Sequence, residues 1–109
     1  MMSNEVLARN FKALSHPRRA MIFRLLAKSP EAGDSLDRLL QATRLRYSSL
    51  VHHLREMERC GLVRRHRRGP EVAYRLVPGD LSAALGEAVD ITQVARHRPR
   101  NAAQAAQAA

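Results

Sequence analysis

The chain has little of what stabilises secreted or membrane proteins. It holds a single cysteine, Cys60, among 109 residues, so one chain cannot form an internal disulfide. No apolar run approaches the ~18 residues that a membrane-spanning helix needs. Residues 1–9 mix charged and apolar side chains and lack the apolar block of a secretory signal. These absences predict an intracellular protein, with the cytoplasm as its default location.

Aromatic residues are also scarce, at 4% of the chain, and tryptophan is absent. Apolar residues still make up 45% of the sequence, which is enough for one small core built from aliphatic side chains. We predict a folded domain over residues 1–95. Residues 96–109 form an Ala/Gln-rich tail that offers little to bury, and we predict that it is disordered.

Signatures of catalysis are missing as well. The sequence has no glycine-rich phosphate loop, no paired carboxylates in an apolar setting and no nucleophile motif. A metal site built from Cys60, His52, His53 and His66 would need ligands on different sides of a helix and a hairpin. We therefore expect neither an enzyme nor a bound cofactor.

Arginine is what the sequence has in excess. Seventeen arginines and two lysines oppose 10 acidic residues, which gives a formal net charge of +9. Eight of these arginines lie between Arg44 and Arg68, where only Glu56 and Glu58 oppose them. Because guanidinium groups bind phosphate through parallel hydrogen bonds, this local concentration predicts a nucleic-acid partner.

Apolar residues at helical spacing predict four helices in the first part of the chain. These are residues 4–14, residues 17–28, a short helix capped by Asp34 or Ser35, and residues 47–60. Leu50, Leu54 and Met57 should form the inner face of the fourth helix, and Gly61 should end it.

Two strands are predicted after the fourth helix, at residues 62–66 and 72–77, with a hairpin tip at residues 67–71. Asp80 can then cap a last helix. The order is four helices, a β-hairpin and a helix, which is a mainly α fold with a small hairpin. The third and fourth helices would form a helix-turn-helix and the hairpin its wing, so the sequence predicts a winged helix-turn-helix.

Polar side chains near the start of the fourth helix are the predicted base contacts, because this part of the helix enters the major groove in such folds. They are Tyr47, Ser48, Ser49 and His52. His53 lies beside the apolar face, and we predict a partly buried structural role for it. The alternative is that the polar set simply faces water.

Arginines at the helix entrance and along the hairpin are the predicted phosphate and wing contacts. They are Arg44, Arg46, Arg65, Arg67 and Arg68. Arg44 and Arg46 stand where backbone N–H groups already attract anions, and Arg67 and Arg68 stand at the predicted tip. A solvated basic surface is the alternative for both groups.

Four pieces of the sequence resemble ArsR/SmtB-type winged-helix repressors. Residues 11–19 (FKALSHPRR) resemble the ALxxPxR opening of that family. Residues 52–55 (HHLR) and 61–63 (GLV) resemble its HL(K/R)xL…GLV signature. Residues 68–69 (RG) and 73–76 (AYRL) resemble its RxG…YxL wing, and the whole match spans about residues 6–85.

The resemblance implies a homodimer that binds an inverted repeat in double-stranded promoter DNA, represses transcription by occlusion and releases DNA when an effector binds. It also implies that the first and last helices form the dimer interface. Small residues in the last helix suit close packing of this kind. The predicted interface residues are Leu7, Phe11, Leu81, Leu85 and Val89.

The sequence departs from the family pattern in two places. Val51 occupies a position where the recognition helix often has serine, so the preferred DNA sequence could differ. The metal-sensing motif is missing, because residues 34–39 contain no thiol and Asp90 is followed by Ile91 and Thr92 instead of the expected ligands. Metal sensing is therefore not expected.

Three questions stay open at this level. The signal that releases DNA could be a small molecule bound at the dimer interface or oxidation of Cys60, or there is no ligand at all. For Cys60, the alternatives are packing beneath the Gly61 turn and a redox role. Arg18 and Arg19 open the second helix, where DNA-backbone contact, pairing with Glu and capping of the subunit edge all fit. An RNA- or ribosome-associated basic module is the alternative function, with a protein-binding adaptor as a third, although few aromatics are present to stack unpaired bases.

Overall fold

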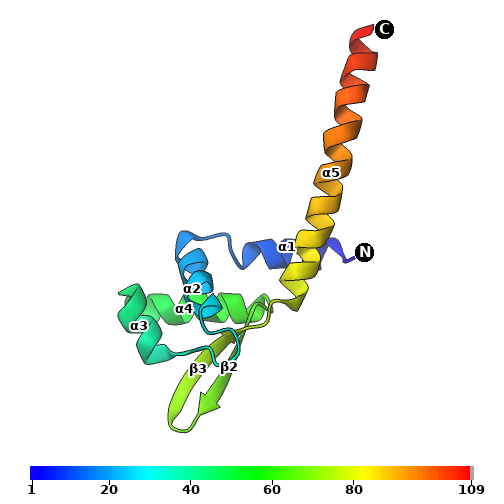
Figure 1. Cartoon of the computed structure of the whole chain (residues 1–109). Helices are drawn as coiled ribbons and strands as arrows, with labels where there is room; N and C mark the ends of the chain where they lie inside the picture. Colours follow the sequence, from blue (N-terminus) through cyan, green and yellow to red (C-terminus); the bar gives the residue numbers. More distant parts are fainter. Residues whose placement is uncertain (109) are drawn as a thin grey trace.

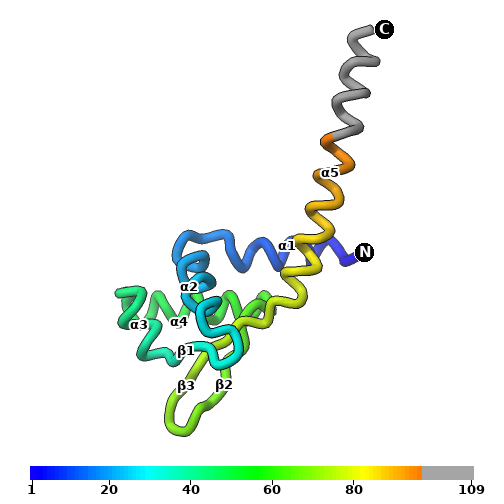
Figure 2. The backbone as a smooth tube through the Cα atoms, in the orientation of Figure 1, coloured from blue at the N-terminus to red at the C-terminus, as the bar shows by residue number. Residues whose placement is uncertain are grey.

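The computed structural model describes residues 1–96 in full and the backbone as far as residue 108 (Figures 1 and 2). Of the tail predicted at residues 96–109, only Arg96 lies within the fully described part. The domain boundary at residue 95 and the disorder of the tail therefore stay predictions.

The order of elements confirms the predicted winged helix-turn-helix. The elements are α1 (Asn4–Lys12), α2 (Pro17–Ala27), β1 (Asp34–Ser35), α3 (Leu36–Thr43), α4 (Tyr47–Arg59), β2 (Val63–Arg68), β3 (Glu71–Leu76) and α5 (Gly79–Ala108). Strand β1 is the one element that sequence patterning missed. The helix-turn-helix is α3 with α4, and β2 with β3 forms the wing below them in Figure 1.

The helix ends follow from local capping chemistry. The Ser35 hydroxyl accepts a hydrogen bond from the Arg38 N–H at 3.2 Å and so caps α3. Gly61 has φ +83° and ends α4, as predicted. Its N–H donates to the Glu58 carbonyl at 2.9 Å, and the following Leu62 N–H donates to Met57 at 3.0 Å. The predicted cap at Asp80 is wrong, because α5 already begins at Gly79 and Asp80 lies in its first turn.

The wing belongs to a three-stranded antiparallel sheet of order β1-β3-β2. Within it, Val63 pairs with Leu76 at one end of the hairpin and Arg68 pairs with Glu71 at the other. The predicted tip at residues 67–71 is therefore too long, and Gly69-Pro70 alone makes the turn. Strand β1 has two residues, too few for an alternating pattern, and only its distant partner β3 defines it.

Gly33 fixes the approach of the α2–β1 loop to the sheet. Its φ is +68°, and a Cβ at this position would lie 2.0 Å from the Tyr74 carbonyl oxygen. Any side chain there would displace the loop from β3, because real Cβ atoms do not approach an oxygen so closely.

The core sits between α4, α2, α3 and the sheet. Leu50, Leu54 and Met57 are fully buried, which confirms the predicted inner face of α4. The apolar side of the wing comes from β3, where Tyr74 is 5% exposed and Leu76 8%. Helix α1 packs beside α5 away from the wing, as Figure 2 shows. No helix in the described part of the chain is long and apolar enough to cross a membrane.

Candidate nucleic-acid interface

The outer face of α4 carries a continuous polar and basic surface. Ser48, His52, Arg55 and Arg59 recur at spacings of three and four residues and are all exposed. Together with Tyr47, Val51 and Glu56 they line a shallow hollow on the helix surface. The structure thus brings three of the four predicted base contacts, Tyr47, Ser48 and His52, to one face.

The structure differs from the predicted set of base contacts at two residues, Ser49 and Arg55. Ser49 is half-buried and does not line this hollow, because it lies about 100° around the helix from Ser48. Arg55 was not selected, although it lies four residues after Val51 on the exposed face. Helical spacing from Ser48 would have identified it.

The turn into α4 presents unoccupied backbone donors beside two arginines. Arg46 is the N-cap residue of α4, and its side chain makes no capping hydrogen bond. The first N–H groups of the helix therefore point outward without a side-chain acceptor, an arrangement that suits a phosphate oxygen. Arg44 instead ends α3, with φ 56° and its N–H donating to the Leu40 carbonyl at 3.0 Å. The C-terminus of α3 favours this positive charge.

Strand β2 places arginines on both faces of the wing. Arg65 and Arg67 lie opposite Tyr74 and Val72, while Arg64 and Arg68 lie opposite Arg75 and Glu71. The four β2 arginines are all exposed. The Arg68 guanidinium also donates from Nη1 to the Ala32 carbonyl at 3.1 Å, which holds it against the α2–β1 loop. The wing therefore offers a basic edge in which Arg68 is already partly engaged.

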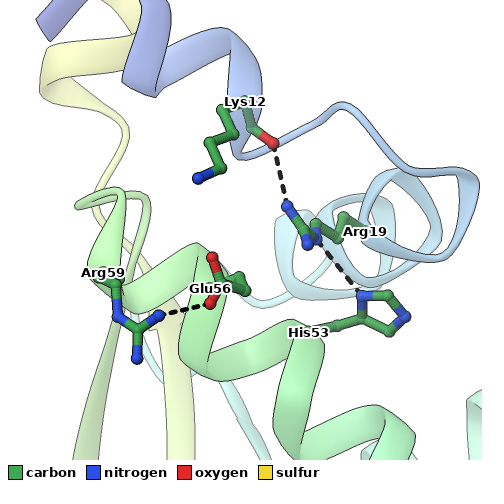
Figure 3. Close-up of polar contacts among 5 residues, drawn as sticks. All are labelled: Lys12, Arg19, His53, Glu56 and Arg59. Atoms are coloured by element: carbon green, nitrogen blue, oxygen red, sulfur yellow. Dashed lines mark hydrogen bonds and ion pairs between the residues drawn. The ribbon is translucent and has the colours of Figure 1, made fainter. Parts of the chain in front are cut away.

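Arg19 occupies a different environment from the other arginines. It is 9% exposed, and its Nη1 donates to the Lys12 carbonyl at 3.1 Å. Its Nε donates to His53 Nδ1 at 3.3 Å (Figure 3). Contact with the DNA backbone is therefore wrong for Arg19, because its guanidinium faces the interior of the fold.

His53 lies on the inner side of α4, as predicted, and is 6% exposed. Burial is the main reason that the pKa of His53 lies below its usual 6.5, and the positive charges of His16 and Arg19 lower it further. The neutral imidazole that results can accept the Arg19 hydrogen bond.

The predicted dimer residues divide into exposed and buried members. Phe11 is 41% exposed, Leu85 47% and Val89 49%, while Leu7 is half-buried. The predicted interface role of Leu81 is wrong, because Leu81 is 4% exposed and belongs to the core of its own chain. Ile91 and Val94, which lie outside the predicted interface set, are also exposed, at 52% and 56%.

Cys60 is buried, at 6% exposure, and packs in the core below the Gly61 turn. Burial favours the packing role over a redox role, since oxidants need access to the sulfur. Over residues 1–96, no group of three or more His, Cys, Asp or Glu side chains could hold a metal ion.

Solved structures similar to this chain include a transcriptional regulator and a winged helix-turn-helix DNA-binding domain. An ArsR-like transcriptional regulator from Rhodococcus sp. RHA1 is 28% identical, with a TM-score of 0.74, and the alignment covers 96% of this chain and 94% of that one. A homodimeric winged helix-turn-helix DNA-binding domain from Mycobacterium bovis is 26% identical, with a TM-score of 0.64 and coverage of 89% and 94%. HlyU from Vibrio cholerae is 30% identical, with a TM-score of 0.61 and coverage of 70% and 80%. Comparison with protein-family models and with curated protein sequences gives no match.

Proposed function

The chain belongs to the ArsR family of winged-helix transcriptional regulators, and from this premise we propose that it is a cytoplasmic repressor that binds an inverted repeat as a homodimer. Two copies of α4 related by a two-fold axis would enter successive major grooves, about 34 Å apart. Occupation of a promoter by the dimer would then exclude the transcription machinery.

One observation carries the proposal: the two sides of α4 differ completely. Leu50, Leu54 and Met57 are fully buried on one side, while the other side is polar, basic and uncovered. A helix that is anchored in the core and presents such a face fits the major groove of duplex DNA. The wing arginines flank it on the same chain and suit the neighbouring phosphates.

The proposed contacts divide the work between affinity and selectivity. Arg44, Arg46, Arg65, Arg67 and Arg68 are the phosphate contacts, and they supply attraction to any duplex. Tyr47, Ser48, Ser49 and His52 are the base contacts, to which the exposed position of Arg55 adds a fifth. Each well-made base contact discriminates by roughly 1–3 kcal/mol.

Exposed apolar surface supports the homodimer. Phe11 on α1 and Leu85 and Val89 on α5 are each about half exposed, and α1 packs against α5. The M. bovis neighbour is described as homodimeric, which favours the same assembly here. We propose that Leu7, Phe11, Leu85 and Val89 contribute to the interface.

Selection from a pool of random duplexes tests the function. The full chain should enrich a two-fold symmetric site, and its affinity for that site should fall steeply as salt rises, since bound arginines displace counterions. Structured RNA of equal length is the competitor that separates the RNA-binding alternative. Enrichment of no duplex, or stronger binding to the RNA, would refute the proposal.

A further inference from the structure

We infer that Arg19 is a positioning residue for the DNA-reading helix, which it ties to α1 through His53, and that this tie holds only while His53 is uncharged. The inference rests on the proposed function, because it concerns how α4 is oriented on DNA. It assigns a role to a buried pair that makes no contact with DNA itself.

The geometry of Arg19 joins three elements. Arg19 stands in the first turn of α2, and its Nη1 donates to the carbonyl of Lys12, the last residue of α1. Its Nε donates to His53 Nδ1 on α4, as Figure 3 shows. A single guanidinium thus links the end of α1 to the middle of α4.

The charge of Arg19 is balanced without a carboxylate. The ion pairs found among the described residues are Arg38–Asp34 and Arg59–Glu56, and neither includes Arg19. Its compensation comes instead from the carbonyl end of α1, which carries partial negative charge, and from the imidazole lone pair. A buried cation is strongly destabilised when either acceptor is lost.

The hydrogen bond fixes the state of the imidazole. Arg19 Nε can only donate, so His53 Nδ1 must offer a lone pair and the ring proton must sit on Nε2. A second proton on Nδ1 would remove the acceptor and set two cations face to face. The pair can therefore exist only with a neutral His53.

The cationic and imidazole neighbours of His53 oppose a second proton. The His16 ring, at the N-cap of α2, lies 4.6 Å from the His53 ring between centroids, and the His52 ring on α4 lies 5.5 Å away. Arg18 and Arg19 on α2 add positive charge on the same side. The nearby carboxylate on α4, Glu56, is engaged with Arg59 at 2.6 Å.

Loss of the tie should affect specific binding more than general attraction to DNA. His53 is adjacent in α4 to His52, a proposed base contact, so a shift of α4 against α1 moves the reading face directly. Base contacts need closely defined geometry, whereas attraction to phosphates tolerates small displacements. The informative quantity is therefore the ratio of the two affinities, for the selected site and for random duplex.

Two other effects of low pH change both affinities equally and therefore cancel in this ratio. Protonation of exposed histidines outside the base contacts adds positive charge and strengthens binding to every duplex. Because the pKa of His53 is lowered in the folded chain, the unfolded chain binds more protons, and the free energy of unfolding decreases as pH falls below the usual 6.5. Partial unfolding lowers both affinities by the same factor and leaves the ratio unchanged.

The test measures both affinities of the full chain at about pH 7.5 and about pH 5.5, at constant ionic strength and at a temperature where circular dichroism shows it folded. For the native chain, we expect the ratio to fall roughly tenfold at the lower pH, as for the loss of one charged hydrogen bond. His53→Asn keeps an acceptor near the Nδ1 position but cannot be protonated, so its ratio should stay constant. His66→Asn on β2, which removes an imidazole outside the proposed base and phosphate contacts, is the matched control and should retain the fall.

A spectroscopic measurement on the native chain keeps the inference testable if His53→Asn does not fold. Nitrogen-15 NMR of the imidazole should show an unprotonated Nδ1 at His53 at about pH 7.5, with its proton on Nε2. A Nδ1–H tautomer would overturn the inference. So would a ratio that does not change with pH in the native chain, or a His53→Asn ratio that still falls. Failure to prefer any duplex at either pH would instead refute the proposed function.

Discussion

Two exposed surfaces of this chain differ in chemistry but share one property. The outer face of α4 and the β2 strand present arginines, whereas α5 presents large apolar side chains such as Leu85 and Val89. Gathered positive charge repels itself, and exposed apolar area is unfavourable in water. Each surface is thus unfavourable in the isolated chain, and each becomes favourable only when a partner covers it.

The partners that the two surfaces need are of different kinds. A polyanion compensates the arginines, and its attraction weakens with salt. An apolar surface is best covered by a second apolar surface, and that contact depends little on salt. The comparison therefore predicts that binding to DNA and dimerisation can be disrupted separately, and the following substitutions test this.

The largest effect is expected at the apolar surface. Leu85→Glu should separate the dimer, because an unpaired carboxylate would be buried at the interface. Loss of the second reading helix should weaken binding to a symmetric site on the order of a hundredfold. Sedimentation equilibrium and fluorescence anisotropy measure the two quantities. Lys28→Gln, which makes the same change in net charge outside α1 and α5, should alter neither, and a dimeric Leu85→Glu variant would place the interface elsewhere.

A smaller and salt-dependent effect is expected at the wing. Arg68→Ala should weaken binding to all duplexes while leaving the dimer intact. The slope of log affinity against log salt should decrease in magnitude by about one for the lost phosphate contact. Arg24→Ala, at an exposed position on α2, is the control. Unchanged affinity at low salt would show that Arg68 binds the Ala32 carbonyl and makes no contact with DNA.

Within the basic surface, Ser49 separates reading of bases from attraction to phosphates. Ser49→Ala should cost about 1 kcal/mol on the selected site and almost nothing on random duplex. Competition binding with the two DNAs gives the difference. Equal losses of affinity for both DNAs would show that Ser49 does not contact a base. The test is informative because Ser49 is only half-exposed. Ser48→Ala is the comparison on the fully exposed side.

The smallest effect concerns the turn between α3 and α4. Arg44 adopts φ 56°, a left-handed conformation that glycine accepts more readily. Arg44→Gly should raise the free energy of unfolding by less than about 1 kcal/mol, because relief of strain is partly offset by the greater freedom of the unfolded chain. The same variant should bind DNA more weakly if Arg44 contacts phosphate. Urea denaturation and the anisotropy assay measure both, and Arg44→Ala separates the loss of charge from the relief of strain.

Sequence patterning predicted the elements that local chemistry determines. The inner face of α4 follows from Leu50, Leu54 and Met57 at helical spacing, and its end follows from Gly61. The polar outer face follows from the same spacing, which is why Tyr47, Ser48 and His52 meet on one side.

Features that depend on distant partners could not be predicted in this way. Strand β1 exists because Asp34 and Ser35 pair with a strand that comes about 40 residues later. The burial of Arg19 depends on His53, 34 residues away. Leu81 lies four residues before Leu85 on the same helical face, but the first turn of α5 lies against the core, so the predicted interface role of Leu81 is wrong. Periodicity identifies a face, and only the tertiary fold decides what covers it.

The small strand β1 has a consequence for the DNA that this protein can bind. It joins the start of α3 directly to β3, and Gly33 lets the preceding loop lie on that strand. The wing and the helix-turn-helix therefore keep a fixed relative position. When both contact the same duplex, the DNA must change its shape to fit the protein. Base pairs between the groove contact and the wing contact should then be selected for how easily they bend, although no side chain touches them.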